Sequence, residues 1–382
     1  MISGQPASRP RASFVSLLRR RQALVLFGLA GFLFLLLVLA MGRFLFGSTA
    51  WAYDFSAYYL ALERLVSDGS PYQASTLAGP FHAGPFGLYL YSPVPVVMLL
   101  PLAGLALSDA ALIFLVLRLA MLVGMCALMP VSRAVRLATL CVACISAPVL
   151  QDLNLGNASL IVTFFAVVAW RYLDRPTGAA SIGAALFVRP TMGLFLGWWL
   201  LRGRLRPLLW VAVTVSALFL LTLPFVGMRG WSEYLTLLSN LSGFEGVFRN
   251  FALGALVGRF GVPDWVAELV QFAGYGLAAF AMLFSLRRDR ELSFVVTLGA
   301  TLLVSPLLWD HYLTNLLVPA AFLADRGRWP LLLLPLLCWL PQELLAFVAL
   351  AGMLLPFVAR DRGEPAGTLT GRLVMRRSTA PA

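Results

Sequence analysis

An aspartate in an aromatic stretch is the first residue whose type and setting could do chemistry. Asp54 is surrounded in sequence by Trp51, Tyr53, Phe55, Tyr58 and Tyr59. Partial removal from water makes a carboxylate more basic, which suits a general base that takes a proton from a hydroxyl. The structural alternative is that Asp54 is the N-cap of a helix beginning at Phe55.

A second charged residue lies inside an apolar stretch. Arg189 directly precedes Pro190 and is flanked by apolar residues. A charge within a membrane segment is costly and is by default a sign of function. A guanidinium suits a phosphate ligand, because its fork of N–H donors matches the phosphate oxygens. The structural alternative is a side chain that snorkels to the membrane surface, which is harder from the middle of a segment.

His311 is one of only two histidines and follows Asp310. A single histidine at a helix end is usually an interface residue with satisfied hydrogen bonds. The adjacent Asp310 also allows a carboxylate–imidazole pair, in which the acid tunes the histidine as a base. Both interpretations remain open at this point.

The other polar or reactive positions are weaker signals. The stretch 151–157 is polar and contains Gln151 and Asn154, and Arg249-Asn250 forms a second polar pair. Each alone has the composition of a hydrophilic turn. Arg118 is intramembrane without a motif around it, so it is either structural or of unknown role. The pair Cys141 and Cys144 has no second cysteine or histidine cluster nearby, which favours a buried helical pair over a metal or redox site.

The elements that must position these residues are membrane helices. Of the 382 residues, 60% are apolar and only 12% are charged, and the mean hydropathy is +0.86. Long continuous apolar runs favour α-helices over the short alternating segments of a barrel. The sequence therefore predicts an all-α, polytopic integral membrane protein. The net charge of +12 comes from arginines at helix ends. That placement is a topology signal rather than a nucleic-acid-binding patch.

The chain divides into a basic cytoplasmic N-terminus at 1–21, a single membrane domain at 22–359 and a polar cytoplasmic tail at 360–382 that is expected to be disordered. Roughly 10–13 transmembrane or re-entrant helices are predicted. The apolar segments are 22–42, 92–107, 110–130, 134–150, 157–173, 178–201, 207–227, 263–286, 292–308, 311–324, 329–342 and 343–359. A long extracytoplasmic loop at 43–91 contains a helix over 55–67, expected along the membrane surface.

Arginine clusters at 202–206, 287–290, 326–328 and 360–377 predict the cytoplasmic side. Residues 228–262 and 305–311 then share the far side with 43–91. The cytoplasmic side is reached by Arg133, Arg136, Arg171 and Arg175 only if the segment 92–107 does not cross the whole membrane. The three prolines of that segment are compatible with a re-entrant piece. The segment 178–201 is interrupted at Arg189-Pro190 and is compatible with two half-helices.

Taken in order, the motifs resemble the GT-C-type, polyprenol-phosphate-mannose-dependent glycosyltransferases of the glycosyltransferase 87 or DUF2029-like family. The similarity covers about residues 20–325 as spaced short motifs. The matching positions are Asp54-Phe55, Tyr58-Tyr59, Gly69-Ser70-Pro71-Tyr72, Tyr91-Ser92-Pro93, Pro101-Leu102-Ala103, Gln151 with Asn154, Arg189-Pro190, Arg249-Asn250 and Ser305-Pro306 with Trp309, His311 and Tyr312. The sequence departs from the pattern at Asp310, where the family often has histidine.

The resemblance implies an enzyme of the inner (plasma) membrane with its active site facing the periplasm or exterior. It would transfer a sugar, expected to be mannose, from a polyprenyl-phosphate donor to a hydroxyl of a glycolipid, polysaccharide or protein, with inversion. By resemblance, Asp54 is the general base, His311 lies near it and Arg189 lies near the donor phosphate. The remaining motif positions are expected to bind substrate: Tyr58, Tyr59, Tyr91, Gln151, Asn154, Arg249, Asn250, Trp309 and Asp310.

The sugar transfer that the resemblance implies is compatible with the chemistry of Asp54 and Arg189. A polyprenyl phosphate is already a good leaving group, so the reaction needs a base more than a strong acid. No cofactor is required; a divalent metal is compatible, but no cluster of oxygen ligands supports one. Two other classes stay open: a lipid or solute transporter whose pathway these charges line, and a non-catalytic subunit of an envelope-assembly complex.

Overall fold

The computed structural model describes residues 12–47, 51–78, 89–173, 175–240 and 250–359, and every regular element assigned within them is a helix. The predicted all-α polytopic membrane fold is therefore confirmed. Each apolar segment predicted above contains at least one helix. The predicted cytoplasmic tail at 360–382, most of the N-terminus and Arg249 lie outside the described residues.

Four helices are long and apolar enough to cross a bilayer. They are the Gln22–Leu45 part of α1 (Ala12–Gly47), α5 (Leu107–Leu128), α11 (Leu205–Asn240) and α13 (Asp264–Ser285). A fifth candidate is the pair α6 (Arg133–Ile145) and α7 (Ala147–Leu155), bent by 61°. Large apolar side chains such as Phe27, Trp265 and Phe272 stay exposed on these helices, as lipid contact requires.

Several further helices are shorter. They are α8 (Ser159–Arg171), α9 (Pro176–Leu186), α10 (Leu194–Leu201), α12 (Leu253–Gly258), α14 (Arg290–Leu303), α15 (Leu317–Asp325) and α16 (Leu345–Leu354), with 3-10 segments η5 (Trp329–Trp339), η6 (Gln342–Leu344) and η7 (Leu355–Val358). Some of them, such as α14 and α15, are largely buried, and residues 317–324 of α15 are all buried. The longest of these α-helices, α14, has 14 residues and is therefore about 21 Å long, so none of these α-helices crosses a bilayer alone.

Prolines set two breaks that position the site. The segment 92–107 forms only α4 (Pro93–Met98) and the 3-10 turn η1 (Leu100–Leu102), which are too short to span. The segment 178–201 is broken between α9 and the 3-10 turn η2 (Pro190–Gly193), which leads into α10. Proline lacks an N–H and disfavours a helical residue before it, so Arg189 leaves the helix with extended backbone (φ −139°, ψ 98°).

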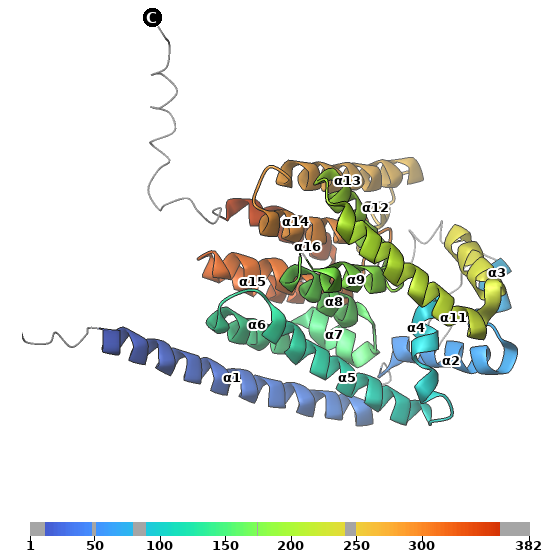
Figure 1. The fold of residues 1–382 in the computed structure, drawn as a ribbon, viewed down its shortest axis with the longest axis horizontal. Coiled ribbons are helices and arrows are strands. Elements are labelled where there is room, and N and C mark those ends of the chain that lie inside the picture. Colours follow the sequence, from blue (N-terminus) through green and yellow to red (C-terminus); the bar gives the residue numbers. More distant parts are fainter. Residues whose placement is uncertain (1–11, 48–50, 79–88, 174, 241–249, 360–382) are drawn as a thin grey trace, which may run out of the picture.

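One end of the molecule is built from α2 (Tyr53–Asp68), α3 (Ala74–Ala78) and α4, packed against the second half of α11 (Figure 1). The predicted helix over 55–67 is present and ends at Gly69, whose φ of 73° suits glycine. It begins earlier than predicted, at Tyr53. Its N-cap is Ala52, without a side-chain cap bond, so the alternative that Asp54 is an N-cap is wrong.

The turns that carry arginine clusters meet away from α2, α3 and α4 (Figure 1). Three contacts join them: Arg202 Nη2 to Arg288 O (3.4 Å), Arg326 Nη1 to Asp289 Oδ2 (3.1 Å), and Ser132 N to Asp325 Oδ1 (2.8 Å). The α5–α6 turn, the α10–α11 turn, the α13–α14 turn and the end of α15 therefore share one face. This arrangement agrees with the requirement that 92–107 does not fully span.

Candidate active site

The start of α2 packs tightly against the turn between α7 and α8. The Ala52 N–H donates to the Asn154 carbonyl at 2.8 Å. Gly156 in that turn has a φ of 77°, and a Cβ there would lie 2.5 Å from Phe55 Cβ. Only glycine permits both the left-handed backbone and this close approach. The contact brings Asp54, the second residue of α2, to the polar side of the turn.

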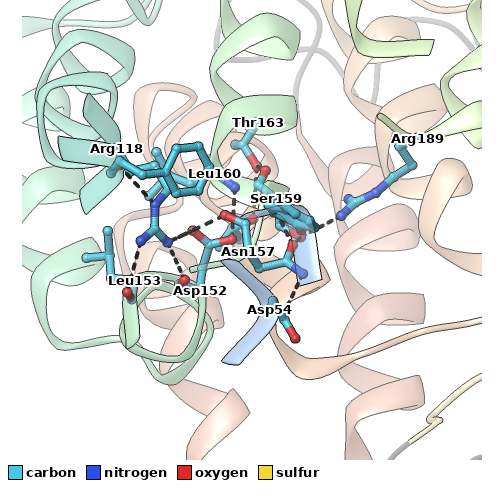
Figure 2. Close-up of polar contacts among 12 residues, drawn as sticks. Asp54, Arg118, Asp152, Leu153, Asn157, Ser159, Leu160, Thr163 and Arg189 are labelled. Carbon is cyan, nitrogen blue, oxygen red and sulfur yellow. Dashed lines mark hydrogen bonds and ion pairs between the residues drawn. The ribbon is translucent and has the colours of Figure 1, made fainter. Parts of the chain in front are cut away.

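The Asp54 carboxylate is held by an amide (Figure 2). Asn157 Nδ2 donates to Asp54 Oδ2 at 2.8 Å. Asn157 Oδ1 accepts two hydrogen bonds from Ser159, one from its backbone N–H and one from its hydroxyl, both at 2.9 Å. Because the amide oxygen is occupied in this way, the amide nitrogen must face Asp54. Asp54 itself is half-buried.

The environment of Asp54 makes it a stronger base than an exposed aspartate. Burial raises the pKa of the Asp54 carboxyl above its ordinary value. The neighbouring charge of His311, the hydrogen bond from Asn157 and, more weakly, Arg118 oppose this rise, while the negative charge of Asp310 adds to it. The net shift of the pKa is upward. A carboxylate in this state can accept a proton from a hydroxyl near neutral pH.

Arg189 reaches the same turn from the break before η2. Its Nη2 donates to the Ser159 hydroxyl at 2.6 Å, and its guanidinium carbon lies 3.7 Å from the ring centroid of Tyr312. The residue is only 5% exposed, and its Nη1 has no hydrogen-bond partner within the described residues. A buried cationic donor without a partner is costly. It is the group expected to meet an anionic oxygen.

His311 lies in the 3-10 segment η4 (Asp310–Leu316) and is 4% exposed. Its Nδ1 is 3.4 Å from Asp310 Oδ1, and Asp310 Oδ1 also accepts the His311 backbone N–H at 2.9 Å. Neither ring nitrogen has a hydrogen-bond partner in the part of the chain that the structure describes. Trp309 and Tyr312 pack around the ring, with centroids at 5.8 and 5.1 Å. The charges of His311 and Asp310 act on Asp54, so both residues lie near it, while Trp309 packs against the His311 ring.

The three candidate tyrosines divide between the site and the scaffold. Tyr58 is one helical turn after Asp54, and its hydroxyl donates to the Tyr91 hydroxyl at 2.9 Å. The ring centroids of these two tyrosines are 5.1 Å apart. Tyr59 points elsewhere, because its hydroxyl donates to the Leu105 carbonyl. Tyr58 and Tyr91 therefore border the site, whereas Tyr59 ties α2 to the segment before α5.

The polar clusters predicted from sequence have different positions. Gln151 is half-buried in α7, and Asn154 Oδ1 is buried without a hydrogen-bond partner among the described residues. Asn250 is fully buried and joins its loop to the segment before η4. Its Nδ2 donates to Pro306 O at 2.9 Å, and its Oδ1 accepts from Leu308 N at 2.9 Å. Asn250 therefore fixes its own segment to the residues before η4, and its role in substrate binding stays a prediction.

Arg118 has a structural role. Its guanidinium donates to the backbone carbonyls of Asp152 and Leu153 at the end of α7 and lies 3.5 Å from Asp152 Oδ2 (Figure 2). Asp152 Oδ1 in turn accepts the Leu160 N–H of α8 at 3.2 Å. A cation at a helix C-terminus satisfies carbonyls that lack intrahelical donors. The buried Arg118–Asp152 pair thus fixes the α7–α8 turn that holds Asp54.

Two residues at the centre of the arrangement were not singled out from the sequence. Asn157 was part of a stretch interpreted as a hydrophilic turn, and Ser159 was not considered. An asparagine two residues before a serine at a helix start is typical of an Asx turn, which predicts the local bond. Nothing local predicts that the amide also meets Asp54, which is 103 residues earlier.

The structure also describes the cysteines and the acid clusters. Cys141 and Cys144 are free and buried in α6, as are Cys126 and Cys338 in their own elements. Among the described residues, no group of three or more His, Cys, Asp or Glu side chains could hold a metal ion.

Comparison with known proteins gives one match. A family model described as Glycosyltransferase family 87 matches residues 89–306, more than half of the chain. No curated protein and no solved structure matches. The matched range includes Tyr91, the α7–α8 turn, Arg189 and Asn250. Asp54 precedes it and His311 follows it.

Proposed function

Because this chain belongs to glycosyltransferase family 87, and is therefore a glycosyltransferase, we propose that it uses a polyprenyl-phosphate sugar as donor. The acceptor hydroxyl attacks the anomeric carbon from the face opposite the phosphate. The new glycosidic bond forms as the bond from the anomeric carbon to the phosphate oxygen breaks, so the anomeric configuration inverts. The hydroxyl proton passes to Asp54, and polyprenyl phosphate leaves.

The observation that carries the proposal is that a carboxylate and a buried guanidinium belong to one hydrogen-bonded group. Asp54 has one carboxylate oxygen fixed by Asn157, and Arg189 presents a buried Nη1 without a partner in the described residues. Ser159 connects Asn157 to Arg189. A phosphate that leaves with growing negative charge is stabilised by such a donor. A carboxylate of raised pKa is suited to accept the proton that the acceptor loses.

The active site is proposed to face the periplasm or exterior of the inner (plasma) membrane. The arginine-bearing turns share one face, which the charge rule assigns to the cytoplasm, and α2 lies away from them. A donor with a long polyprenyl chain needs an enzyme in contact with the bilayer, and exposed apolar side chains on α1 and α13 supply that contact.

Purified protein in detergent tests the proposal directly. It is incubated with polyprenyl-phosphate mannose, other polyprenyl-phosphate sugars and nucleotide sugars, together with glycolipid, polysaccharide and protein acceptors. We expect sugar transfer with inversion and equimolar release of polyprenyl phosphate from the lipid donor, with mannose preferred. Transfer from nucleotide sugars alone contradicts the donor class. Movement of the lipid across sealed vesicles without cleavage contradicts the enzymatic function.

The proposed chemistry needs no metal, since Arg189 supplies the positive charge at the phosphate. The same assay is repeated with EDTA and then with added Mg²⁺ or Mn²⁺. We expect the rate of transfer to be unchanged by EDTA. Loss of activity with recovery on adding a divalent ion contradicts the metal-free scheme.

A further inference from the structure

The amide of Asn157 has only one orientation that satisfies its surroundings. Its oxygen accepts two hydrogen bonds from Ser159, and its nitrogen donates to Asp54 Oδ2. Asn157 is 3% exposed, so water does not compete for these contacts. With Oδ2 engaged, Oδ1 is the carboxylate oxygen left to receive a proton. The amide thus selects the basic atom of Asp54.

Ser159 has a fixed direction of hydrogen bonding as well. A serine hydroxyl has one proton and two acceptor lone pairs. Arg189 can only donate, and its Nη2 lies 2.6 Å from Ser159 Oγ, so the serine proton must go to another acceptor. That acceptor is Asn157 Oδ1 at 2.9 Å. Consecutive bonds of this kind polarise one another in a buried site.

We propose that Asn157 is a positioning residue for the Asp54 base, and that Ser159 joins it to Arg189 so that the base and the cation act as one unit. This inference rests on the proposed function. The chain of donors runs from Arg189 through Ser159 and Asn157 to Asp54 (Figure 2). It connects the break before η2, the start of α8 and the start of α2, three elements far apart in sequence.

The competing interpretation is that Asn157 serves only the turn. Its bond to the Ser159 N–H is an Asx turn, which would stabilise the start of α8 without regard to Asp54. Serine supports the same kind of turn through its hydroxyl but is too short to replace the amide donor to Asp54. Asn157→Ser therefore separates the two roles, and Asn157→Ala removes both.

The effect on pH dependence has a definite sign. A hydrogen bond donated to a carboxylate favours its charged form and lowers its pKa. Without Asn157 the pKa of Asp54 rises further, and the acid limb of kcat/KM, which reports the free-enzyme base, moves to higher pH. The other ionisable groups that interact with Asp54 are unchanged by the substitution: Arg118, Asp152, Asp310 and His311, and the tyrosines Tyr58, Tyr91 and Tyr312.

The experiment measures kcat, donor KM and the pH profile for Asn157→Ser, Asn157→Ala and Asn240→Ala. Asn240 is a matched control, because its amide donates to the Leu77 carbonyl away from the site. We expect both Asn157 variants to lose about 10- to 100-fold in kcat, since a hydrogen bond to a charged group is lost, with an upward shift of the acid limb of about one pH unit. Thermal unfolding checks that each variant folds.

The proposal that Asp54 and Arg189 act together through Ser159 is tested with Ser159→Ala and with the double variant Ser159→Ala/Asn157→Ala. Groups that act together give non-additive losses, so the double variant is expected to be no slower than Asn157→Ala. If the fold-loss in rate of the double variant equals the product of the losses of the two single variants, the link through Ser159 is contradicted. An Asn157→Ser variant with the wild-type rate and an unshifted acid limb overturns the positioning role. If Asp54→Asn is inactive in that case, the proposed function stands and only the inference fails.

Discussion

At the scale of single residues, the site contains two side chains with buried polar atoms that have no partner among the described residues. Arg189 is buried with a donor that has no partner among the described residues, and the same holds for both ring nitrogens of His311. Buried polar groups are normally hydrogen-bonded, so such exceptions need a physical reason. A phosphate beside Arg189 and an acceptor hydroxyl beside Asp54 would supply the missing partners.

Replacement of Arg189 should therefore weaken donor use. For Arg189→Gln we expect kcat/KM for the lipid donor to fall about 10- to 100-fold, because a charged hydrogen bond to phosphate is lost. Arg206→Gln is the control, since Arg206 is exposed in the first turn of α11. Steady-state kinetics with varied donor check the prediction. Equal kcat/KM in the two variants would rule out a role for Arg189 at the phosphate.

The wild-type pH profile is a second prediction at this scale. Burial raises the pKa of Asp54, and transfer needs the deprotonated carboxylate. Activity is therefore expected to fall as pH drops through this raised pKa, at a higher pH than an exposed aspartate would give. The check is to measure kcat/KM in buffers of constant ionic strength from about pH 4 to about pH 8, roughly the range in which a carboxyl group of raised pKa titrates. A rate that does not change across this range speaks against Asp54 as the base.

At the scale of elements, the α7–α8 turn is the part that assembles the site. It contacts the start of α2 through Gly156, holds Asp54 through Asn157, and is itself fixed by Arg118 and Asp152. The sequence predicted a hydrophilic turn over 151–157, but α7 continues to Leu155, so the turn is shorter, and its contacts were not predicted. Helix periodicity and proline breaks are local properties, whereas the meeting of α2 with α7 depends on tertiary packing.

A substitution at Gly156 tests this packing. In Gly156→Ala the new Cβ would lie 2.5 Å from Phe55 Cβ at a positive φ, so α2 must shift. We expect a loss of stability of about 1–3 kcal/mol and a larger loss of transfer activity, because Asp54 moves with α2. Gly197→Ala in α10 is the control, since a Cβ added at Gly197 would have no neighbour within 4 Å. Thermal unfolding and the transfer assay are measured together, and unchanged values for Gly156→Ala would contradict the close contact.

At the scale of the whole molecule, much of the architecture follows from the sequence. Apolar run length predicted the helices, and Pro93 and Pro190 mark breaks that are present. Asp54 and Arg189 were each identified by a charge in apolar or aromatic surroundings, and His311 as one of only two histidines, next to Asp310. Asn157 and Ser159 could not be identified in this way, because polar residues at a turn are ordinary until a distant carboxylate is known to meet them. The start of α2 was misplaced by two residues, because its cap is the unusual Ala52 backbone.

Sidedness is the prediction at this scale. In a variant without the four native cysteines, Ser67→Cys and Arg206→Cys place single thiols on exposed positions of α2 and of the first turn of α11. A membrane-impermeant maleimide applied from outside the inner membrane is expected to label Ser67→Cys and not Arg206→Cys, since arginine-bearing turns prefer the cytoplasm. Labelling of Arg206→Cys alone would place the site on the cytoplasmic face.

The central claim is that Asp54 takes the proton from the acceptor during sugar transfer. Its most direct test is the single-turnover rate of transfer from the polyprenyl-phosphate donor by Asp54→Asn, compared with Asp68→Asn at the exposed end of the same helix. We predict unchanged donor affinity and unfolding temperature for both variants. We also predict a loss of about 100- to 10,000-fold in rate for Asp54→Asn alone. Transfer by folded Asp54→Asn at the wild-type rate would contradict the account.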